Sequence, residues 1–166
     1  MPPELIRDCL TLTRIVWPPK EMHVVRVEKQ RIEEPRIPGD RWHVVRQENR
    51  VVAVSRSFPR VIAEGSGRRF SILALASVCT HPDHRHAGLG RSVVAAAWSR
   101  LSPDLPVCFF QTGVPAFYEK QGARVVDNLI RNGKEGAKAF WDPYAMIYPA
   151  SAPWPETPID LLGPGW

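Results

Sequence analysis

The sequence has few cysteines and lacks any long uninterrupted apolar run. Its three cysteines, Cys9, Cys79 and Cys108, are odd in number and widely spaced. This argues against a disulfide framework and is typical of a reduced, intracellular protein. No apolar run approaches the length of a membrane span, and the acidic residues Glu4 and Asp8 argue against a secretory signal at the N-terminus. We therefore expect a cytoplasmic protein without a membrane partner.

Runs of lysine and arginine are also missing. The formal net charge of +5 is spread along the chain, which suits an anionic ligand but lacks the basic patches that grip nucleic acid. The chain has 166 residues, of which 44% are hydrophobic and 23% charged, and this is enough to bury a core of ordinary size. We expect one α+β domain over residues 1–166, with residues 151–166 as an irregular C-terminal tail because prolines and glycines interrupt it.

The middle of the chain predicts a strand, a glycine-containing loop and a helix in succession. The apolar run Ile72–Cys79 predicts a buried strand, and Gly88 and Gly90 lie in the loop that follows. The helix after the loop is predicted by one apolar stripe, made of Leu89, Val93, Val94, Ala97, Trp98 and Leu101. Such a junction directs unpaired backbone N–H groups and the positive end of the helix dipole to one point. It therefore predicts a seat for a phosphorylated ligand.

The charges around this loop are of one sign. No acidic residue lies between Arg85 and Arg100, so nothing in this segment repels an anion. Arg85 and Arg91 flank the turn and would add charge-assisted hydrogen bonds. The two glycines let a ligand approach the backbone, because they carry no Cβ atom.

This loop has interpretations other than a phosphate-binding site. The glycine spacing fits neither a Walker A loop nor the dinucleotide-binding fingerprint. A plain tight turn shaped by Gly88 and Gly90 stays open. The histidines His81, His84 and His86 suggest a metal site, but no fourth Cys or His lies at zinc-ligand spacing. We expect no metal.

A second motif lies downstream. Val107–Gln111 predicts another short buried strand, and Val114–Ala123 follows it with the sequence Val-Pro-Ala-Phe-Tyr-Glu-Lys-Gln-Gly-Ala. The pattern Arg85-x-x-Gly88-x-Gly90 after a buried strand resembles the acyl-CoA signature of the GNAT superfamily of N-acetyltransferases, and Val114–Ala123 resembles a second helical motif of that superfamily. The resemblance implies a GNAT fold, in which a mostly antiparallel, twisted sheet is flanked by helices and its strands splay at Val78–Thr80.

The resemblance also implies roles for individual residues. The backbone N–H of Val78 would hold the acetyl oxygen, and the Tyr118 hydroxyl would protonate the leaving CoA thiolate. Gln111 stands where many relatives carry an asparagine that binds the pantetheine arm. The residues implied in acetyl-CoA binding are Val78, Cys79, Thr80, Arg85, His86, Ala87, Gly88, Leu89, Gly90, Arg91, Gln111, Phe117 and Tyr118. A packing role for Tyr118 stays open.

The activity that the resemblance implies is transfer of an acetyl group from acetyl-CoA to a primary amine of a small molecule, by direct attack in a ternary complex. Because Cys79 and Cys108 lie on predicted buried strands, we expect no acetyl-cysteine intermediate. A non-catalytic acyl-CoA sensor and an N-acetyltransferase of proteins or peptides stay open as alternatives. A homodimer also stays open.

The general base and the acceptor are weakly marked. Glu64, His43, His81 and Asp142 are candidates for the base by residue type alone, and a water relay would serve as well. The C-terminal segment ending in Trp166 resembles the end of aminoglycoside 2'-N-acetyltransferases. This resemblance implies that Asp160 and the Trp166 carboxylate bind a cationic acceptor. A tail that simply packs on the domain is the open alternative.

The remaining segments predict further elements of the same unit. We expect a helix over Pro3–Ile15 and a hairpin of two strands over Trp42–Gln47 and Val51–Phe58. A connection over Arg60–Arg69 leads into the central strand. Two late strands are expected over Arg124–Val126 and Ala145–Tyr148. The polar, proline-containing segment Glu28–Asp40 predicts a loop close to the substrate.

Overall fold

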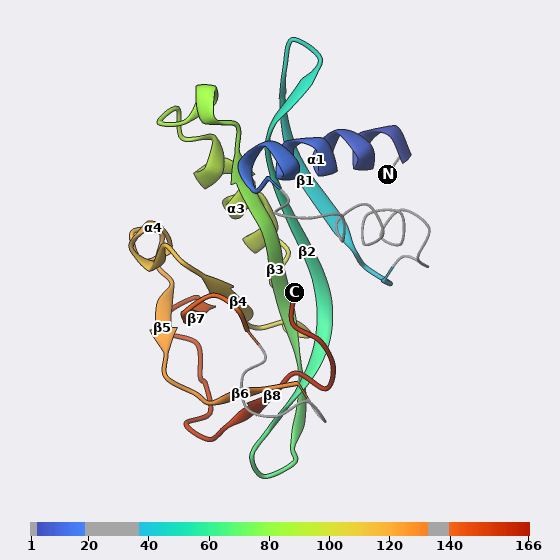
Figure 1. The fold of residues 1–166 in the computed structure, drawn as a ribbon. Helices are drawn as coiled ribbons and strands as arrows, with labels where there is room; N and C mark the ends of the chain where they lie inside the picture. The colour runs from blue at the N-terminus through green and yellow to red at the C-terminus, as the bar shows by residue number, and fades with distance from the viewer. Residues whose placement is uncertain (1–2, 19–36, 133–139) are drawn as a thin grey trace. The chain divides into compact units, whose positions relative to one another are not determined.

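A computed structural model describes residues 3–18, 37–132 and 140–166, so most of the loop expected over Glu28–Asp40 lies outside the described residues. The chain forms two compact units (Figure 1). The first comprises residues up to Phe58 together with Ser77–Ala97, and the second comprises Pro59–Ala76 and Trp98–Trp166. The expectation of one domain stays a prediction.

The fold is α+β. The elements are, in chain order, α1 (Pro3–Val16), β1 (Arg41–Gln47), β2 (Arg50–Glu64), β3 (Arg69–Thr80), the 3₁₀ turn η1 (Pro82–His84), α3 (Leu89–Trp98), β4 (Cys108–Thr112), α4 (Pro115–Glu119), β5 (Arg124–Val126), β6 (Ile130–Arg131), β7 (Tyr144–Tyr148) and β8 (Ile159–Asp160). The strands are hydrogen-bonded in the order β5-β7-β4-β3-β2-β8-β6, and β1 pairs with β2. Parallel pairing occurs between β3 and β4 and between β6 and β8, so the sheet is mixed.

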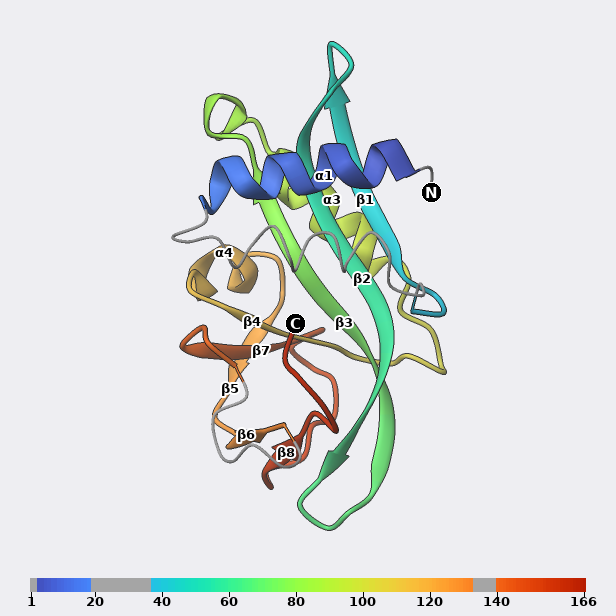
Figure 2. The same cartoon turned by 45° about the vertical axis from the view of Figure 1, so that its right-hand side comes forward.

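In the first unit, helix α1 lies across β1 and β2 (Figures 1 and 2). Its apolar residues recur at helical spacing, which gives the helix one buried face. That face packs in a core cluster of Cys9 and Leu12 from α1, Val51 and Val54 from β2, and Cys79 from β3. This core holds the start of β2 and the end of β3 under the helix.

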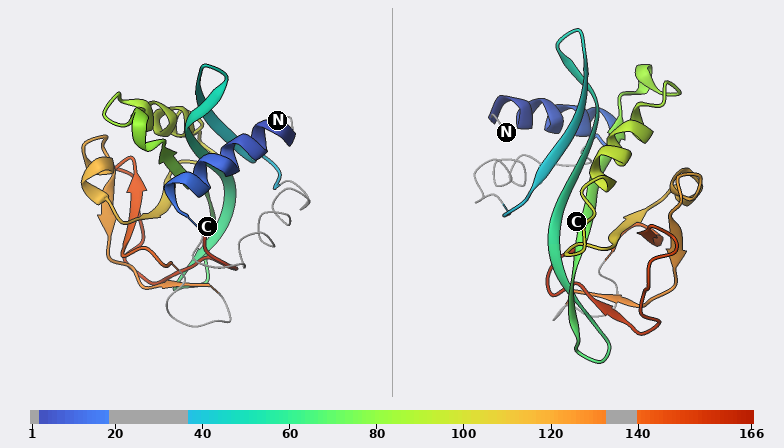
Figure 3. Two further views of the ribbon diagram at one scale, coloured as in Figure 1. Left: turned by 45° about the horizontal axis from the view of Figure 1, so that its top comes forward. Right: turned by 180° about the vertical axis from the view of Figure 1, so that it is seen from behind.

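Helix α3 covers the other face of these strands (Figure 3). Val93 and Val94 are buried on it, and the buried Ser55 hydroxyl on β2 donates a hydrogen bond to the Val93 carbonyl at 2.7 Å. A buried hydroxyl needs such a partner, because an unpaired one would cost free energy. The start of α3 is therefore anchored to β2 within the first unit.

In the second unit, β4 pairs on both of its edges. Its parallel register with β3 is Leu73↔Cys108 and Ala74↔Phe109, and it pairs antiparallel with β7 along its whole length. Cys108, Phe109 and Phe110 are all buried, as expected for a strand that is covered on both faces. Strand β4 ends at Thr112, directly after Gln111, and helix α4 begins three residues later at Pro115.

Most of the expected elements are confirmed. Helix α1, the β1–β2 hairpin, β3, α3, β4, β5 and β7 lie within a few residues of the predicted ranges. The connection expected over Arg60–Arg69 is wrong in its first half, because β2 runs on to Glu64 with Ile62 and Ala63 buried. The irregular tail needs a correction as well: Ile159–Asp160 forms β8, which pairs with both β2 and β6. Strands of two residues gain their order from such partners, which sequence periodicity does not report.

The α1 core predicts the effect of truncating its helix. We expect Leu12→Ala to lower the free energy of unfolding by about 2–5 kcal/mol, because Leu12 is 2% exposed and leaves a cavity against β2. Ile15→Ala on the same helix is the matched control, since Ile15 is 48% exposed and should cost under about 1 kcal/mol. Urea unfolding followed by circular dichroism measures both. Equal losses in the two variants would contradict the packing of α1.

Candidate functional site

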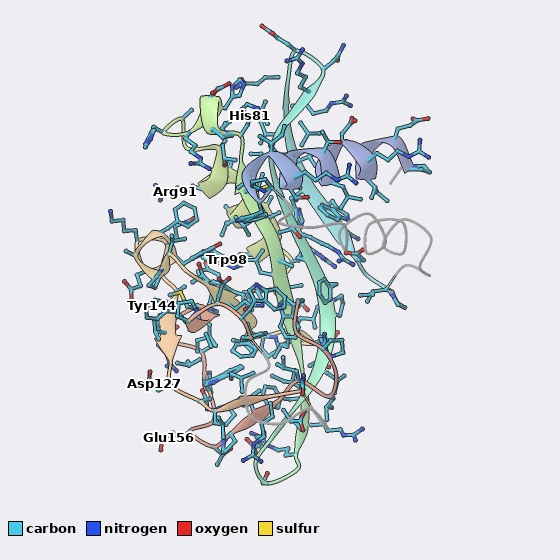
Figure 4. All side chains as sticks on the ribbon, in the orientation of Figure 1. His81, Arg91, Trp98, Asp127, Tyr144 and Glu156 are labelled. Carbon is cyan, nitrogen blue, oxygen red and sulfur yellow. The ribbon has the colours of Figure 1, made fainter. Side chains whose placement is uncertain are left out.

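The connection from β3 to α3 is a short, backbone-bonded turn. The Arg85 N–H donates to the Pro82 carbonyl and the His84 N–H to the His81 carbonyl, which closes η1. The His81 side chain accepts from the Asp83 N–H, and the backbone N–H of His81 donates to the Val52 carbonyl of β2 at 2.8 Å. The turn is thereby tied to the strand beside it. Figure 4 labels His81, at the start of the turn, and Arg91, in the first turn of α3.

Two residues of this turn have a positive φ: His86 at +65° and Gly88. The φ of Gly88 is +75°, and a Cβ atom built there meets nothing within 4 Å, so the space above the backbone is open. Helix α3 begins at the next residue, and in an α-helix the N–H groups of the first residues have no carbonyl partner within the helix. Arg85 and Arg91 are both exposed beside it. This arrangement can bind an anion through backbone N–H groups, the helix dipole and two guanidinium groups.

The end of β3 has an irregular backbone. Ser77 has a φ of +52°, which is uncommon for a residue other than glycine and is typical of a local irregularity in a strand. It directly precedes Val78, whose side chain is half-buried. Cys79 points its thiol into the α1 core, and burial raises its pKa to about 12. A ligand contact of Cys79 or of Val78 and Thr80 would therefore use the main chain, and these contacts stay predictions.

Tyr118 lies in the second unit, among aromatic rings. It is 5% exposed, and its ring centroid is 4.7 Å from that of Phe110, 4.8 Å from that of Phe117 and 6.5 Å from that of Trp98. Trp98 in turn stacks on Tyr148 with a centroid distance of 3.6 Å. The ring of Tyr118 is thus a packed core group, and it is held in one place whether or not its hydroxyl takes part in chemistry.

Gln111 is the centre of a hydrogen-bond network. Its Nε2 donates to the main-chain oxygen of Trp166 at 2.7 Å, and its Oε1 accepts from the N–H groups of Trp141 and Asp142 at 3.0 and 2.9 Å. One side-chain amide on β4 is therefore bonded both to the residues just before β7 and to the C-terminal tail. The expected contact of Gln111 with pantetheine stays a prediction, and this role in holding the tail was not foreseen from the sequence.

Arg60 holds the same tail from β2. Its Nη2 donates to the Leu161 carbonyl at 3.0 Å, and its guanidinium lies 4.7 Å from the ring centroid of Trp166. The Trp166 ring also meets Phe109 and Phe140 edge to face, at 6.1 and 5.3 Å. The tail is therefore ordered by a cation–π contact and aromatic packing. Trp166 was expected as an acceptor-binding residue, and the structure gives it these packing partners.

Asp160, the other residue expected to bind an acceptor, lies on β8. Its Oδ1 accepts from the Leu162 N–H at 2.8 Å, and its main chain pairs with Ala63 and Arg131. One of its carboxylate oxygens is thus occupied by the turn that follows the strand. Its contact with a substrate stays a prediction.

The candidates for the general base differ in environment. Hydrogen bonds from Arg68 and Ser66 lower the pKa of Glu64 to about 2, so Glu64 is a poor proton acceptor at neutral pH. The His43 ring nitrogen Nε2 lies 2.8 Å from the Ser57 hydroxyl. Burial raises the pKa of Asp142 above its usual range. We assign none of them as the base.

Two further findings bear on the class of protein. Within residues 3–18, 37–132 and 140–166, no group of three His, Cys, Asp or Glu side chains is placed to hold a metal ion. No helix in the same described part of the chain has the length and apolar character needed to cross a membrane.

Comparison with known proteins identifies the family. Residues 2–126 match the acetyltransferase (GNAT) domain family, so the chain belongs to the GNAT acetyltransferases. This confirms the superfamily and the fold class expected from the two motifs. No curated protein matches the chain.

Solved structures share the fold. A conserved protein of unknown function from Enterococcus faecalis is similar with a TM-score of 0.61 at 11% identity, over 76% of this chain and 31% of that one. A GCN5-related N-acetyltransferase from Kribbella flavida matches with a TM-score of 0.56 at 19% identity, over 75% and 32%. An acetyltransferase from Trypanosoma brucei matches with a TM-score of 0.56 at 20% identity, over 79% and 94%. The chain thus spans about a third of the length of the first two and nearly all of the third.

The Gln111 network predicts how far one amide stabilises the second unit. We expect Gln111→Ala to lower the free energy of unfolding by about 1–3 kcal/mol, because the Trp166 oxygen and two N–H groups lose their partner. Gln121→Ala is the matched control, since it removes a single bond to the Phe117 carbonyl. Urea unfolding measures stability, and limited proteolysis of the tail measures its release. If Gln111→Ala leaves the tail as resistant as in the wild type, the network does not hold it.

Proposed function

We propose that this protein transfers an acetyl group from acetyl-CoA to a primary amine of a small molecule, by direct attack in a ternary complex. The observation that carries the proposal is Gly88 at φ +75°, with open space above it and the N-terminus of α3 directly after it. The GNAT family in general uses acetyl-CoA. Its pyrophosphate would be taken by the N–H groups from His86 to Arg91 and by the guanidinium groups of Arg85 and Arg91.

Acetyl-CoA supplies an activated thioester, and the chain supplies the groups that orient it. The backbone N–H of Val78 holds the acetyl oxygen as negative charge develops on it, and the main chain of Thr80 pairs with the pantetheine arm. These two roles are carried over from the family. The irregular backbone at Ser77 supports them, because it re-aims the N–H groups that follow it.

The thiolate that leaves needs a proton, and we assign it to the Tyr118 hydroxyl. The packing of Tyr118 against Phe110 and Phe117 supports this, because a fixed donor costs no reorganisation during the reaction. Neither thiol near the strands competes as a nucleophile. Burial raises the pKa of Cys79 to about 12 and raises that of Cys108 further, so both stay protonated at neutral pH.

One observation favours a second function. Tyr118 is almost fully buried among aromatic rings, which is what a residue with only a packing role requires. A chain that keeps the phosphate seat without a proton donor would be an acyl-CoA-binding sensor. The two functions differ in whether an amine releases free CoA thiol.

The phosphate seat predicts the effect of a side chain at Gly88. We expect Gly88→Glu to abolish acetyl-CoA binding, because it puts bulk and negative charge where the pyrophosphate lies. Gly67→Glu is a close control: Gly67 has a φ of +87°, also meets nothing within 4 Å, and lies in the β2–β3 hairpin. The backbone strain is therefore similar in both variants. Calorimetric titration with acetyl-CoA measures the affinity. An unchanged affinity in Gly88→Glu would show that the loop does not bind the pyrophosphate.

The proton donor predicts a separation of turnover from affinity. We expect Tyr118→Phe to lower kcat by about 10²-fold and to leave acetyl-CoA affinity nearly unchanged, because the hydroxyl acts mainly in the transition state. Tyr148→Phe is the control, since Tyr148 stacks on Trp98 in the same aromatic cluster. Free-thiol release with acetyl-CoA and a panel of amines measures kcat. If the kcat of Tyr118→Phe equals that of the wild type, the hydroxyl of Tyr118 is not the proton donor and the residue has only a packing role.

A further inference from the structure

A carboxylate and two exposed aromatic rings lie at the end of β4. Trp141 is 65% exposed and Tyr144 is 41% exposed, and Asp142 lies between them in the sequence. The two exposed aromatic residues and the carboxylate lie within four consecutive residues. Tyr144 pairs with Thr112, the last residue of β4, and it is labelled in Figure 4.

The backbone of this segment is held firmly. Gln111 Oε1 accepts from the N–H groups of both Trp141 and Asp142, and the β4–β7 register sets Tyr144 opposite Thr112. Asp142 Oδ1 lies 3.8 Å from the position that a Cβ of Gly113 would occupy, so the carboxylate sits over a residue without a side chain. A preorganised carboxylate binds a ligand without the entropic cost of ordering a loop.

The charge of Asp142 is uncompensated within residues 3–18, 37–132 and 140–166. No arginine, lysine or histidine of these ranges forms an ion pair with its carboxylate, and no N–H or O–H group there donates to it. It is nevertheless half-buried, and desolvation raises its pKa. By contrast, Asp40 in the first unit is paired in two hydrogen bonds with Arg56. A half-buried carboxylate without a cation is a site at which an added cation gains free energy.

We propose that Asp142, Trp141 and Tyr144 bind a positive charge on the acceptor, so that the preferred acceptor is a diamine or polyamine. This rests on the proposed acetyl transfer. The amine that attacks the thioester must be neutral, so the charge that Asp142 neutralises is a second ammonium group of the same molecule. Trp141 and Tyr144 add cation–π attraction to the ion pair. The site adjoins Gln111, on which the family places the pantetheine arm.

The test compares two probes of similar length whose ends differ in sign. 1,5-Diaminopentane carries two ammonium groups, and glutarate carries two carboxylates and no cation. We expect calorimetry with the CoA-loaded full chain to show tighter binding of the diamine. Asp142→Asn should weaken the binding of the diamine on the order of tenfold and should not weaken that of glutarate. Asp127→Asn is the control, because Asp127 is an exposed carboxylate of the same unit.

A charge reversal separates recognition from folding. Asp142→Lys should bind glutarate more tightly than the diamine, an inversion that a purely structural role would not produce. Equal affinity of the wild type for the two probes, no binding of either, or a diamine affinity that Asp142→Asn leaves unchanged would each overturn the proposal. Acetyl-CoA titration is measured separately. A protein that binds the diamine through Asp142 but does not bind acetyl-CoA would keep this site and lose the proposed acetyl transfer.

Discussion

Backbone pairing on both edges of β4 is the constraint on which the second unit depends. An antiparallel partner pairs with the whole of one edge of β4, a parallel partner pairs with Cys108 and Phe109 on the other edge, and the first three residues of the strand are buried. Because the strand cannot shift its register without exposing Phe109 and Phe110, the position of Gln111 is determined by the sheet. Everything that Gln111 holds then follows from that register.

The side-chain amide of Gln111 joins segments that are distant in the sequence. It is bonded to Trp166 on one side and to Trp141 and Asp142 on the other, across sequence separations of 55, 30 and 31 residues. Arg60 adds a second anchor for the tail from the edge of β2. A chain segment with several prolines and glycines is thereby ordered, although β8 is its one described strand. The same network fixes the backbone of Asp142 beside Gln111.

The first unit combines a buried core with an exposed turn. Helices α1 and α3 cover opposite faces of β2 and β3 and bury the thiols and apolar side chains of those strands. The turn from η1 to Leu89 stays outside this core, and Gly88 presents bare backbone there. The residues that form the core are therefore different from those exposed in the turn.

Local patterns in the sequence determined most of the elements and the family. The stripe after Gly88, the buried runs of β3 and β4 and the motif around Tyr118 depend on spacing within a few turns or strand residues, which a single sequence displays. The tertiary structure alone decided the rest: the extension of β2 to Glu64, the strand β8, and the tail contacts of Arg60 and Gln111. Each of these depends on partners far away in the chain. A short segment is a strand only because of the neighbours that folding brings beside it, and no local pattern records them.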